Sequence, residues 1–159
     1  MLTDVTESPI ERPKKKQKKF YSGNKKRHTL KSQLTVDKDS KKIITTSFGN
    51  GKMHDFRLYK ESNTSIHKDI KSVNDSGYQG LHKIHSNTEL PKKKSKNLPL
   101  SKSDKKYNRN LSSARALNEN VIACIKKFKI ITDRYRNRRK RFALRFNLLC
   151  GIYNWELEN

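Results

Sequence analysis

Cysteine is scarce in this chain of 159 residues, and no long apolar run occurs in it. Both cysteines, Cys124 and Cys150, lie in apolar helical patterns, so we expect buried thiols and not the disulfide framework of a small secreted protein. No apolar run approaches the roughly 18 residues of a membrane-spanning helix. Residues 1–12 also lack the pattern of a signal peptide. These absences predict a cytoplasmic protein.

Acidic residues are scarce as well, because 15 Asp and Glu stand against 38 Lys and Arg. The formal net charge is therefore +23 at pH 7. Such an excess favours a polyanionic partner, and nucleic acid is the commonest one because each neutralised phosphate releases condensed counterions. Charge alone leaves DNA, RNA, catalysis and scaffolding open, since a ribosomal protein would look similar. At this length we expect one domain over 1–159. A DNA-binding chain would associate with the nucleoid.

Short β-like runs separated by turn residues make up the first half of the chain. Each run is rich in Thr, Val, Ile or Leu, and Gly, Asn, Asp or Ser stand between the runs. Three runs in succession predict antiparallel strands at 2–7, 28–37 and 42–48. A short helix is predicted at 54–62 and a further strand at 70–74.

The second half of the chain changes composition twice. Residues 86–106 are rich in Lys, Ser, Asn and Pro, which predicts a basic loop that adds little to a core. Two helical patterns follow, at about 108–132 and 138–157. The second helix carries an apolar stripe that we expect to pack on the sheet, formed by Phe142, Phe146, Leu149, Tyr153 and Leu157. This order of elements predicts a mixed α/β fold around a small sheet.

The helix predicted at 108–132 divides its side chains between two opposed faces. At about 100° per residue, an apolar face forms around Leu117 and Val121. Arg115, Glu119 and Lys126 align on the opposite face. A solvated helix surface explains this pattern, and so does a carboxylate metal ligand flanked by cations that hold phosphates. The helix alone leaves both interpretations open.

Four sequence blocks occur in one order along the chain. The first reads Asp-x-x-Glu-x-x-Ile-x-Arg-Pro at 4–13 and continues as Tyr-Ser-Gly-Asn-Lys-Lys-Arg-His-Thr-Leu-Lys at 21–31. The next two are Gly-Lys-Met-His-Asp-Phe at 51–56 and Asp-Ser-Gly-Tyr-Gln-Gly at 75–80. The last combines Arg115, Glu119 and Lys126 with Arg-Tyr-Arg-Asn-Arg-Arg at 134–139 and Ile-Tyr-Asn at 152–154. Jointly, these blocks strongly resemble the DDE-type transposases of bacterial insertion sequences, from residue 2 to about residue 157.

The resemblance implies a ribonuclease-H-like α/β fold, in which helices flank a mixed sheet, here truncated at the N-terminus. It implies that Asp4, Asp75 and Glu119 are the catalytic carboxylates and hold two Mg²⁺ or Mn²⁺ ions. Such enzymes cleave DNA strands and transfer the 3′ end to target DNA during transposition. The implied partner is DNA, both element ends and target. A homo-oligomer and a DNA-binding region encoded by an upstream frame are further partners that the resemblance leaves open.

DNA-binding residues follow from the resemblance and from the charge. Arg115 and Lys126 are expected to hold phosphates beside Glu119, because they lie about one turn before it and two turns after it. A broader basic surface is expected to contact the DNA backbone, and it includes Lys26, Arg27, Lys31, Arg136, Arg138 and Arg139.

The chain departs from the family pattern in three respects. Ser112 stands where the signature tyrosine is expected, three residues before Arg115. Asp4 follows Met1 so closely that the first strand is expected to be barely present. The family's amino-terminal DNA-binding region is expected to be missing. Two alternatives therefore stay open: a transposase fragment without catalytic activity, and a non-enzymatic basic protein that binds nucleic acid.

Overall fold

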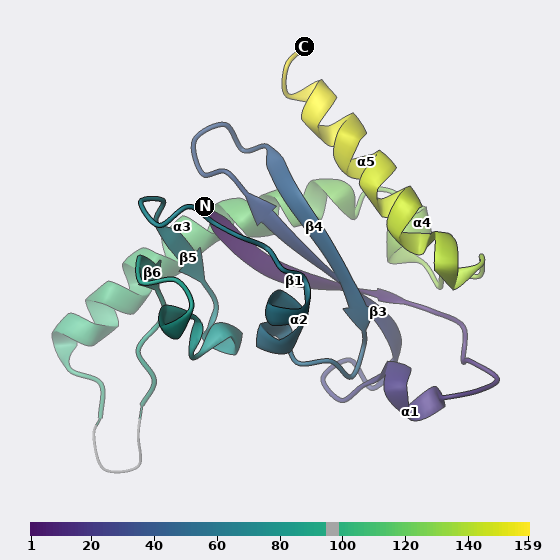
Figure 1. Ribbon diagram of the computed structural model, residues 1–159, viewed down its shortest axis with the longest axis horizontal. Helices are drawn as coiled ribbons and strands as arrows, with labels where there is room; N and C mark the ends of the chain where they lie inside the picture. The colour runs from purple at the N-terminus through teal and green to yellow at the C-terminus, as the bar shows by residue number, and fades with distance from the viewer. Residues whose placement is uncertain (95–98) are drawn as a thin grey trace.

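A mixed sheet organises the structure, a computed structural model that describes residues 1–94 and 99–159 (Figure 1). Its strands are β1 (Leu2–Pro9), β2 (Tyr21–Ser22), β3 (Arg27–Val36), β4 (Ile43–Asn50), β5 (Ser72–Asn74) and β6 (Thr88–Glu89). β3 pairs antiparallel with both β1 and β4, β1 pairs parallel with β5, and β5 pairs parallel with β6. The main strand order is thus β4-β3-β1-β5-β6. This mixed sheet agrees with the predicted ribonuclease-H-like fold, and the predicted strands are confirmed with ends shifted by a few residues.

The first strand is full length, so the expectation that it is barely present is wrong. β1 contains eight residues, and Asp4 is the third of them. All eight pair with β3, from Leu2 opposite Val36 to Pro9 opposite Thr29. The residues after Asp4 therefore hold the strand in the sheet, and the short segment before Asp4 suffices to continue it.

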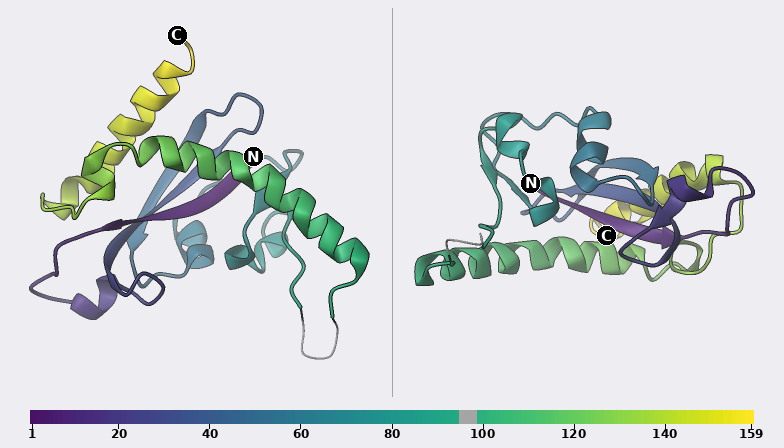
Figure 2. Two further views of the ribbon diagram at one scale, coloured as in Figure 1. Left: turned by 180° about the vertical axis from the view of Figure 1, so that it is seen from behind. Right: turned by 90° about the horizontal axis from the view of Figure 1, so that it is seen from below.

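Five helices accompany the sheet in the described ranges: α1 (Gln17–Phe20), α2 (Asp55–Glu61), α3 (Lys102–Ile125), α4 (Lys129–Thr132) and α5 (Phe142–Glu156). Single 3-10 turns occur at η1 (Ser76–Tyr78), η2 (Leu81–Lys83) and η3 (Arg139–Arg141). Figure 2 shows that α3 lies on one face of the sheet and α2 on the other. None of the helices in this part of the chain has the length and apolarity needed to span a bilayer.

The predicted loop at 86–106 is shorter than expected. It contains β6, and α3 already begins at Lys102 because Ser101 and Asp104 form a capping box. The Ser101 hydroxyl accepts the Asp104 N–H and the Asp104 carboxylate accepts the Ser101 N–H, both at 3.1 Å. Residues 95–98 of that predicted loop lie outside the described residues.

The helix predicted at 108–132 ends early and divides in two. α3 stops at Ile125, and Phe128 adopts an extended backbone before α4 begins. Phe128 packs against the main core, which favours a turn over a continued helix. α5 likewise begins at Phe142, because residues 139–141 form a 3-10 turn.

The main core lies between the sheet and the two long helices. Leu34 of β3 contributes to it together with Val121 and Ile125 of α3 and Phe146 of α5. The stripe predicted on α5 is confirmed for its first four members, which are buried in this core. Leu157 is 41% exposed and follows the end of α5, so its predicted place in the stripe is wrong.

A smaller core covers the opposite face of the sheet. Tyr59 of α2, Tyr78 and Leu81 are buried there, and Val5 of β1 packs against them. Since successive side chains of a strand point to opposite faces, β1 separates the two cores, with Val5 on the α2 side. This sandwich fixes β1, the strand that carries Asp4.

Candidate active site

Two aspartates occupy matching positions on neighbouring parallel strands. β1 and β5 pair through Leu2 with Val73 and through Thr3 with Asn74, and Asp4 and Asp75 are the next residues of each strand. β5 ends at this point because the Asp75 carboxylate accepts the Ser76 N–H at 2.5 Å and caps η1. Residues at matching positions of paired parallel strands direct their side chains to the same face of the sheet. Asp4 thus lies in the strand predicted at 2–7, and Asp75 directly follows the strand predicted at 70–74.

Glu119 of α3 completes a set of three carboxylates around one cavity. Asp4, Asp75 and Glu119 all line a hollow of about 470 Å³, together with Asp55 and Lys126. Glu119 is exposed to solvent, whereas Asp4 is partly buried. The structure therefore brings to one cavity the three acids that the resemblance singles out, from chain positions that are far apart.

Arg115 contacts one of these acids directly. Its Nη1 lies 3.1 Å from Oδ1 of Asp75, and the Arg115 side chain is 20% exposed. Because Arg115 precedes Glu119 by about one helical turn, this ion pair sets the position of α3 against the end of β5. The Arg115 guanidinium is thus engaged within the candidate site through its contact with Asp75.

The Asp4 carboxyl holds its proton more strongly than a free aspartate does. The pKa of Asp4 is raised to about 6, chiefly by burial, and the neighbouring carboxylates of Asp75 and Asp55 contribute to this rise. Hydrogen bonding from the Val5 N–H and the charge of Arg115 oppose this rise in pKa. A cation in the cavity would relieve the repulsion among these acids.

A second ionic group lines the same cavity and was not assigned from the sequence. The buried Lys31 Nζ lies 2.7 Å from Asp55 Oδ1 and 3.9 Å from Glu7 Oε1. The Thr29 hydroxyl donates to the other Glu7 oxygen at 2.7 Å. The sequence did carry a signal, because Glu7 and Asp55 belong to the family-like blocks at 4–13 and 51–56.

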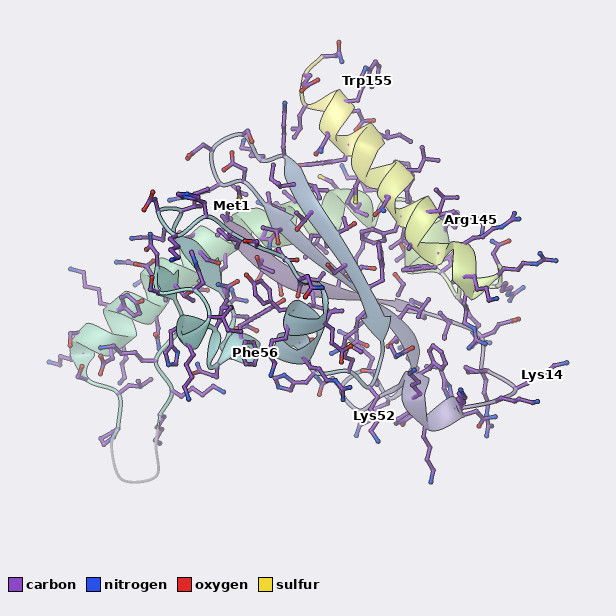
Figure 3. The ribbon with its side chains drawn as sticks, viewed as in Figure 1. Met1, Lys14, Lys52, Phe56, Arg145 and Trp155 are labelled. Carbon is purple, nitrogen blue, oxygen red and sulfur yellow. The ribbon has the colours of Figure 1, made fainter. Side chains whose placement is uncertain are left out.

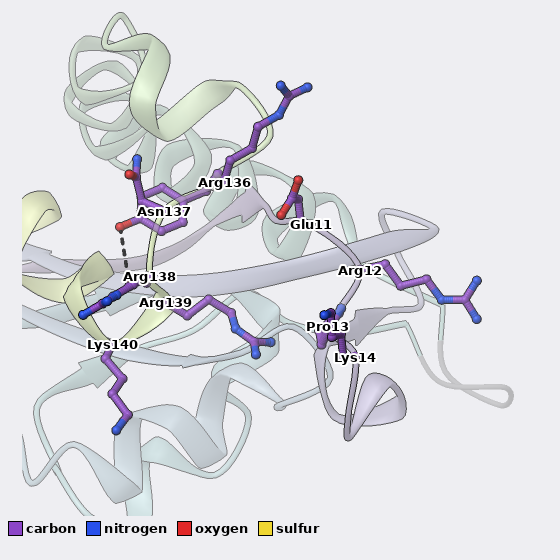
Figure 4. A pocket seen from close by; sticks show the side chains of 10 residues that line it. Glu11, Arg12, Pro13, Lys14, Arg136, Asn137, Arg138, Arg139 and Lys140 are labelled. Carbon is purple, nitrogen blue, oxygen red and sulfur yellow. Dashed lines mark hydrogen bonds between the residues drawn. The ribbon is translucent and has the colours of Figure 1, made fainter.

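Besides Arg115, which pairs with Asp75, the predicted DNA-binding cations fall into three places. Lys126 and Lys31 line the cavity, where burial, and then the charge of Lys25, lowers the pKa of Lys126. Lys26 and Arg27 are exposed at the turn before β3 and at its start. The remaining three form part of a separate basic cleft (Figure 4), namely Arg136, Arg138 and Arg139.

Comparison with known proteins decides the family. The sequence pattern of the DDE superfamily endonucleases matches residues 3–154. The chain belongs to this family. A relative named "Probable transposase for insertion sequence element IS702", from Microchaete diplosiphon, is 50% identical over 157 residues, which cover 99% of this chain and 57% of the relative. The chain thus spans little more than half the length of this relative. No solved structure gives a significant match.

DDE superfamily endonucleases generally use divalent metal ions, and transposases act on DNA. The cavity suits such ions by its donor chemistry, because Asp4, Asp75 and Glu119 offer oxygen atoms only. Within 1–94 and 99–159, however, no three acidic, His or Cys side chains are grouped closely enough to hold an ion. Oδ1 of Asp75 is engaged by Arg115 and by the Ser76 N–H.

Proposed function

We propose that this chain is the catalytic region of a transposase, which cleaves DNA strands and joins the resulting 3′ end to target DNA. The observation that supports it best is the convergence of Asp4, Asp75 and Glu119 on one cavity. Membership of the DDE superfamily endonucleases supports the same activity. The net charge of +23 favours DNA, as element ends and as target, for the partner.

We further propose that Asp4, Asp75 and Glu119 hold two Mg²⁺ or Mn²⁺ ions. Two such ions supply an activated water and stabilise the departing 3′ oxygen of a phosphodiester. The chain's own groups prepare this step. Asp4, with a pKa of about 6, is mostly ionised at neutral pH and available as a ligand, and Asp75 would exchange the Arg115 guanidinium for a metal ligand position. Arg115, once displaced, lies where it can contact a DNA phosphate next to Glu119.

Lys126 has a complementary role at the other end of the cavity. It follows Glu119 by two helical turns and is half-buried beside Lys25. A DNA phosphate entering the cavity would meet both ammonium groups, whose mutual repulsion it would relieve. Lys31 serves differently, because its charge is already matched by Asp55 and Glu7. We assign Lys31 to holding the cavity wall and Lys126 to binding the strand.

The test is cleavage of an end-labelled DNA duplex with Mg²⁺ or Mn²⁺, comparing the chain with Glu119→Gln. Glu119 is exposed, so the amide keeps the shape of the side chain and should leave the fold intact. Glu156→Gln, at an exposed position on α5, is the matched control because it removes one acid outside the cavity. We expect metal-dependent cleavage by the parent and by Glu156→Gln, and none by Glu119→Gln.

Two other outcomes correspond to the alternatives that the sequence leaves open. DNA binding without cleavage by any of the three proteins would favour a catalytically inactive transposase fragment, and fusion of an upstream reading frame would then be assayed. Cleavage that survives in Glu119→Gln would refute the proposed site. A non-enzymatic nucleic-acid-binding protein would explain the charge but gives no reason for three acids on one cavity.

A further inference from the structure

A second cleft, separate from the carboxylate cavity, opens beyond the end of β1. It has a volume of about 610 Å³ and is lined by the segments 11–14 and 135–140 (Figure 4). Lys14, on the first of these segments, lies at the outer edge of the molecule (Figure 3). The lining carries one acid, Glu11, and six cations, which are Arg12, Lys14, Arg136, Arg138, Arg139 and Lys140.

The floor of this cleft is a fixed part of the fold. The Tyr135 N–H donates to the Pro9 carbonyl at 2.8 Å, and the Glu11 N–H donates to the Tyr135 carbonyl at 3.3 Å. Tyr135 is 3% exposed, and its hydroxyl donates to the Arg138 carbonyl at 3.4 Å while it accepts a hydrogen bond from Arg145. These hydrogen bonds tie the two basic segments together at Tyr135.

The cations that line the cleft remain available to a ligand. In the part of the chain that the structure describes, none of the six forms an ion pair. Arg139 lies over the Phe20 ring, 4.7 Å from its centroid, and extends toward Pro13 and Lys14 (Figure 4). Arg12 is oriented by a hydrogen bond of 2.9 Å to Gln17. Guanidinium groups held in this way present forked donors to phosphate oxygens.

We propose that this cleft binds the sugar-phosphate backbone of DNA independently of divalent metal and at a distance from the cleaved bond. The inference rests on the proposed function for the identity of the nucleic acid. Asp4 and Ile10 are separated by six residues of extended chain, which span about 20 Å. At about 3.4 Å per base pair, a duplex would present a further backbone segment roughly six base pairs from the carboxylate cavity. The cleft would therefore hold the duplex while the cavity acts on one bond.

The experiment measures binding of a fluorescent duplex by anisotropy, with EDTA present, over a series of salt concentrations. The test variant is Arg136→Gln/Arg138→Gln/Arg139→Gln, and the matched control is Lys105→Gln/Lys106→Gln/Arg109→Gln. The control removes the same charge from exposed positions near the start of α3. A third protein, with Arg136, Arg138 and Arg139 changed to Lys, keeps the charge and is compared in melting temperature and affinity.

We expect the Gln variant of the cleft to lose affinity by about ten- to a hundredfold at moderate salt, with a log-log salt slope flatter by about three. The control should lose distinctly less, and the Lys variant should retain most of the affinity. Equal losses in the cleft variant and its control would overturn the inference, as would an unchanged affinity. Failure of the proposed function is recognised separately, because it appears as cleavage that survives Glu119→Gln and leaves these binding measurements unaffected.

Discussion

The guanidinium of Arg115 lies 3.1 Å from the carboxylate of Asp75, and this pair links α3 to the end of β5 at the centre of the candidate site. A cationic side chain therefore stands close to where a metal ion would draw its ligands. Such a contact reduces repulsion between Asp75 and Asp4 in the metal-free chain, and an ion bound at the proposed site would compete with it for Asp75. We therefore propose that Arg115 positions Asp75, in addition to its proposed contact with DNA.

Arg115→Gln should make the protein more responsive to divalent cations. Without metal we expect the free energy of unfolding to fall by no more than about 1 kcal/mol, because the pair is partly exposed. Added Mn²⁺ or Mg²⁺ should then raise the melting temperature of the variant more than that of the parent. Arg57→Gln is the control, since it breaks the exposed Arg57–Glu61 pair outside the cavity. An equal gain in melting temperature for all three proteins would show that Arg115 does not compete with the ion.

Asp4→Asn should stabilise the metal-free protein at neutral pH. The pKa of Asp4 is about 6 in the folded chain, above the 3.8 of an unperturbed aspartate, so the folded state binds the proton more tightly. Stability from this group is complete below about pH 4 and is lost as the pH rises through about 6, a change of up to about 3 kcal/mol. The Asp4→Asn variant has no carboxyl group at this position, so it does not lose stability in this way as the pH rises.

Urea unfolding at about pH 4 and about pH 7.5 tests this expectation with EDTA present. The two proteins should differ little at the lower pH, and the variant should be the more stable at the higher pH. Glu156→Gln, outside the cavity, should show no such pH-dependent difference from the parent. A variant that is less stable than its parent at both values would contradict the raised pKa of Asp4.

Local signals in the sequence were sufficient to predict the mixed α/β fold, whereas the three acids were singled out by the resemblance of four sequence blocks to a known family. Alternation predicted β1, β3 and β4, and the helical wheel put Glu119 opposite the apolar face of α3. The ends of the helices were harder to predict from the sequence. The break after Ile125 depends on the packing of Phe128 in the core, and the start at Lys102 depends on a capping box inside a stretch that composition marks as a loop.

The ionic environment of the cavity could not be read from the chain. The sequence predicts Lys31 as part of a broad basic surface that contacts the DNA backbone. The structure shows in addition that Lys31, in the middle of β3, contacts Glu7 on β1 and Asp55 on α2. Strand alternation predicts the face of the sheet on which Lys31 lies, but only the three-dimensional packing shows which acidic side chains it contacts on that face.

Lys31→Met should therefore act on stability before it acts on DNA binding. Removing a buried cation leaves the Glu7 carboxylate, 9% exposed, without its ionic partner, and losses of about 3 kcal/mol or more are typical for such a break. Lys26→Met removes the same charge from an exposed turn and should leave the melting temperature nearly unchanged. Thermal denaturation of the two variants measures the difference directly. Similar melting temperatures for the two variants would mean that the ionic contacts of Lys31 do not stabilise the fold.

Substitution by alanine is expected to have opposite effects on stability at two glycines, Gly51 and Gly151. A Cβ on Gly51 would lie 2.3 Å from the Thr29 hydroxyl and 2.5 Å from the Phe20 carbonyl, so the turn after β4 would have to move. We expect Gly51→Ala to lower the free energy of unfolding by about 2 kcal/mol or more. Because Gly51 leads into α2, the shift should also displace Asp55 from Lys31. Gly151→Ala meets nothing within 4 Å on α5 and should stabilise by about 0.5–1 kcal/mol through helix propensity. Chemical denaturation that ranks Gly51→Ala equal to or above the parent would show that this turn tolerates a side chain and does not fix the start of α2.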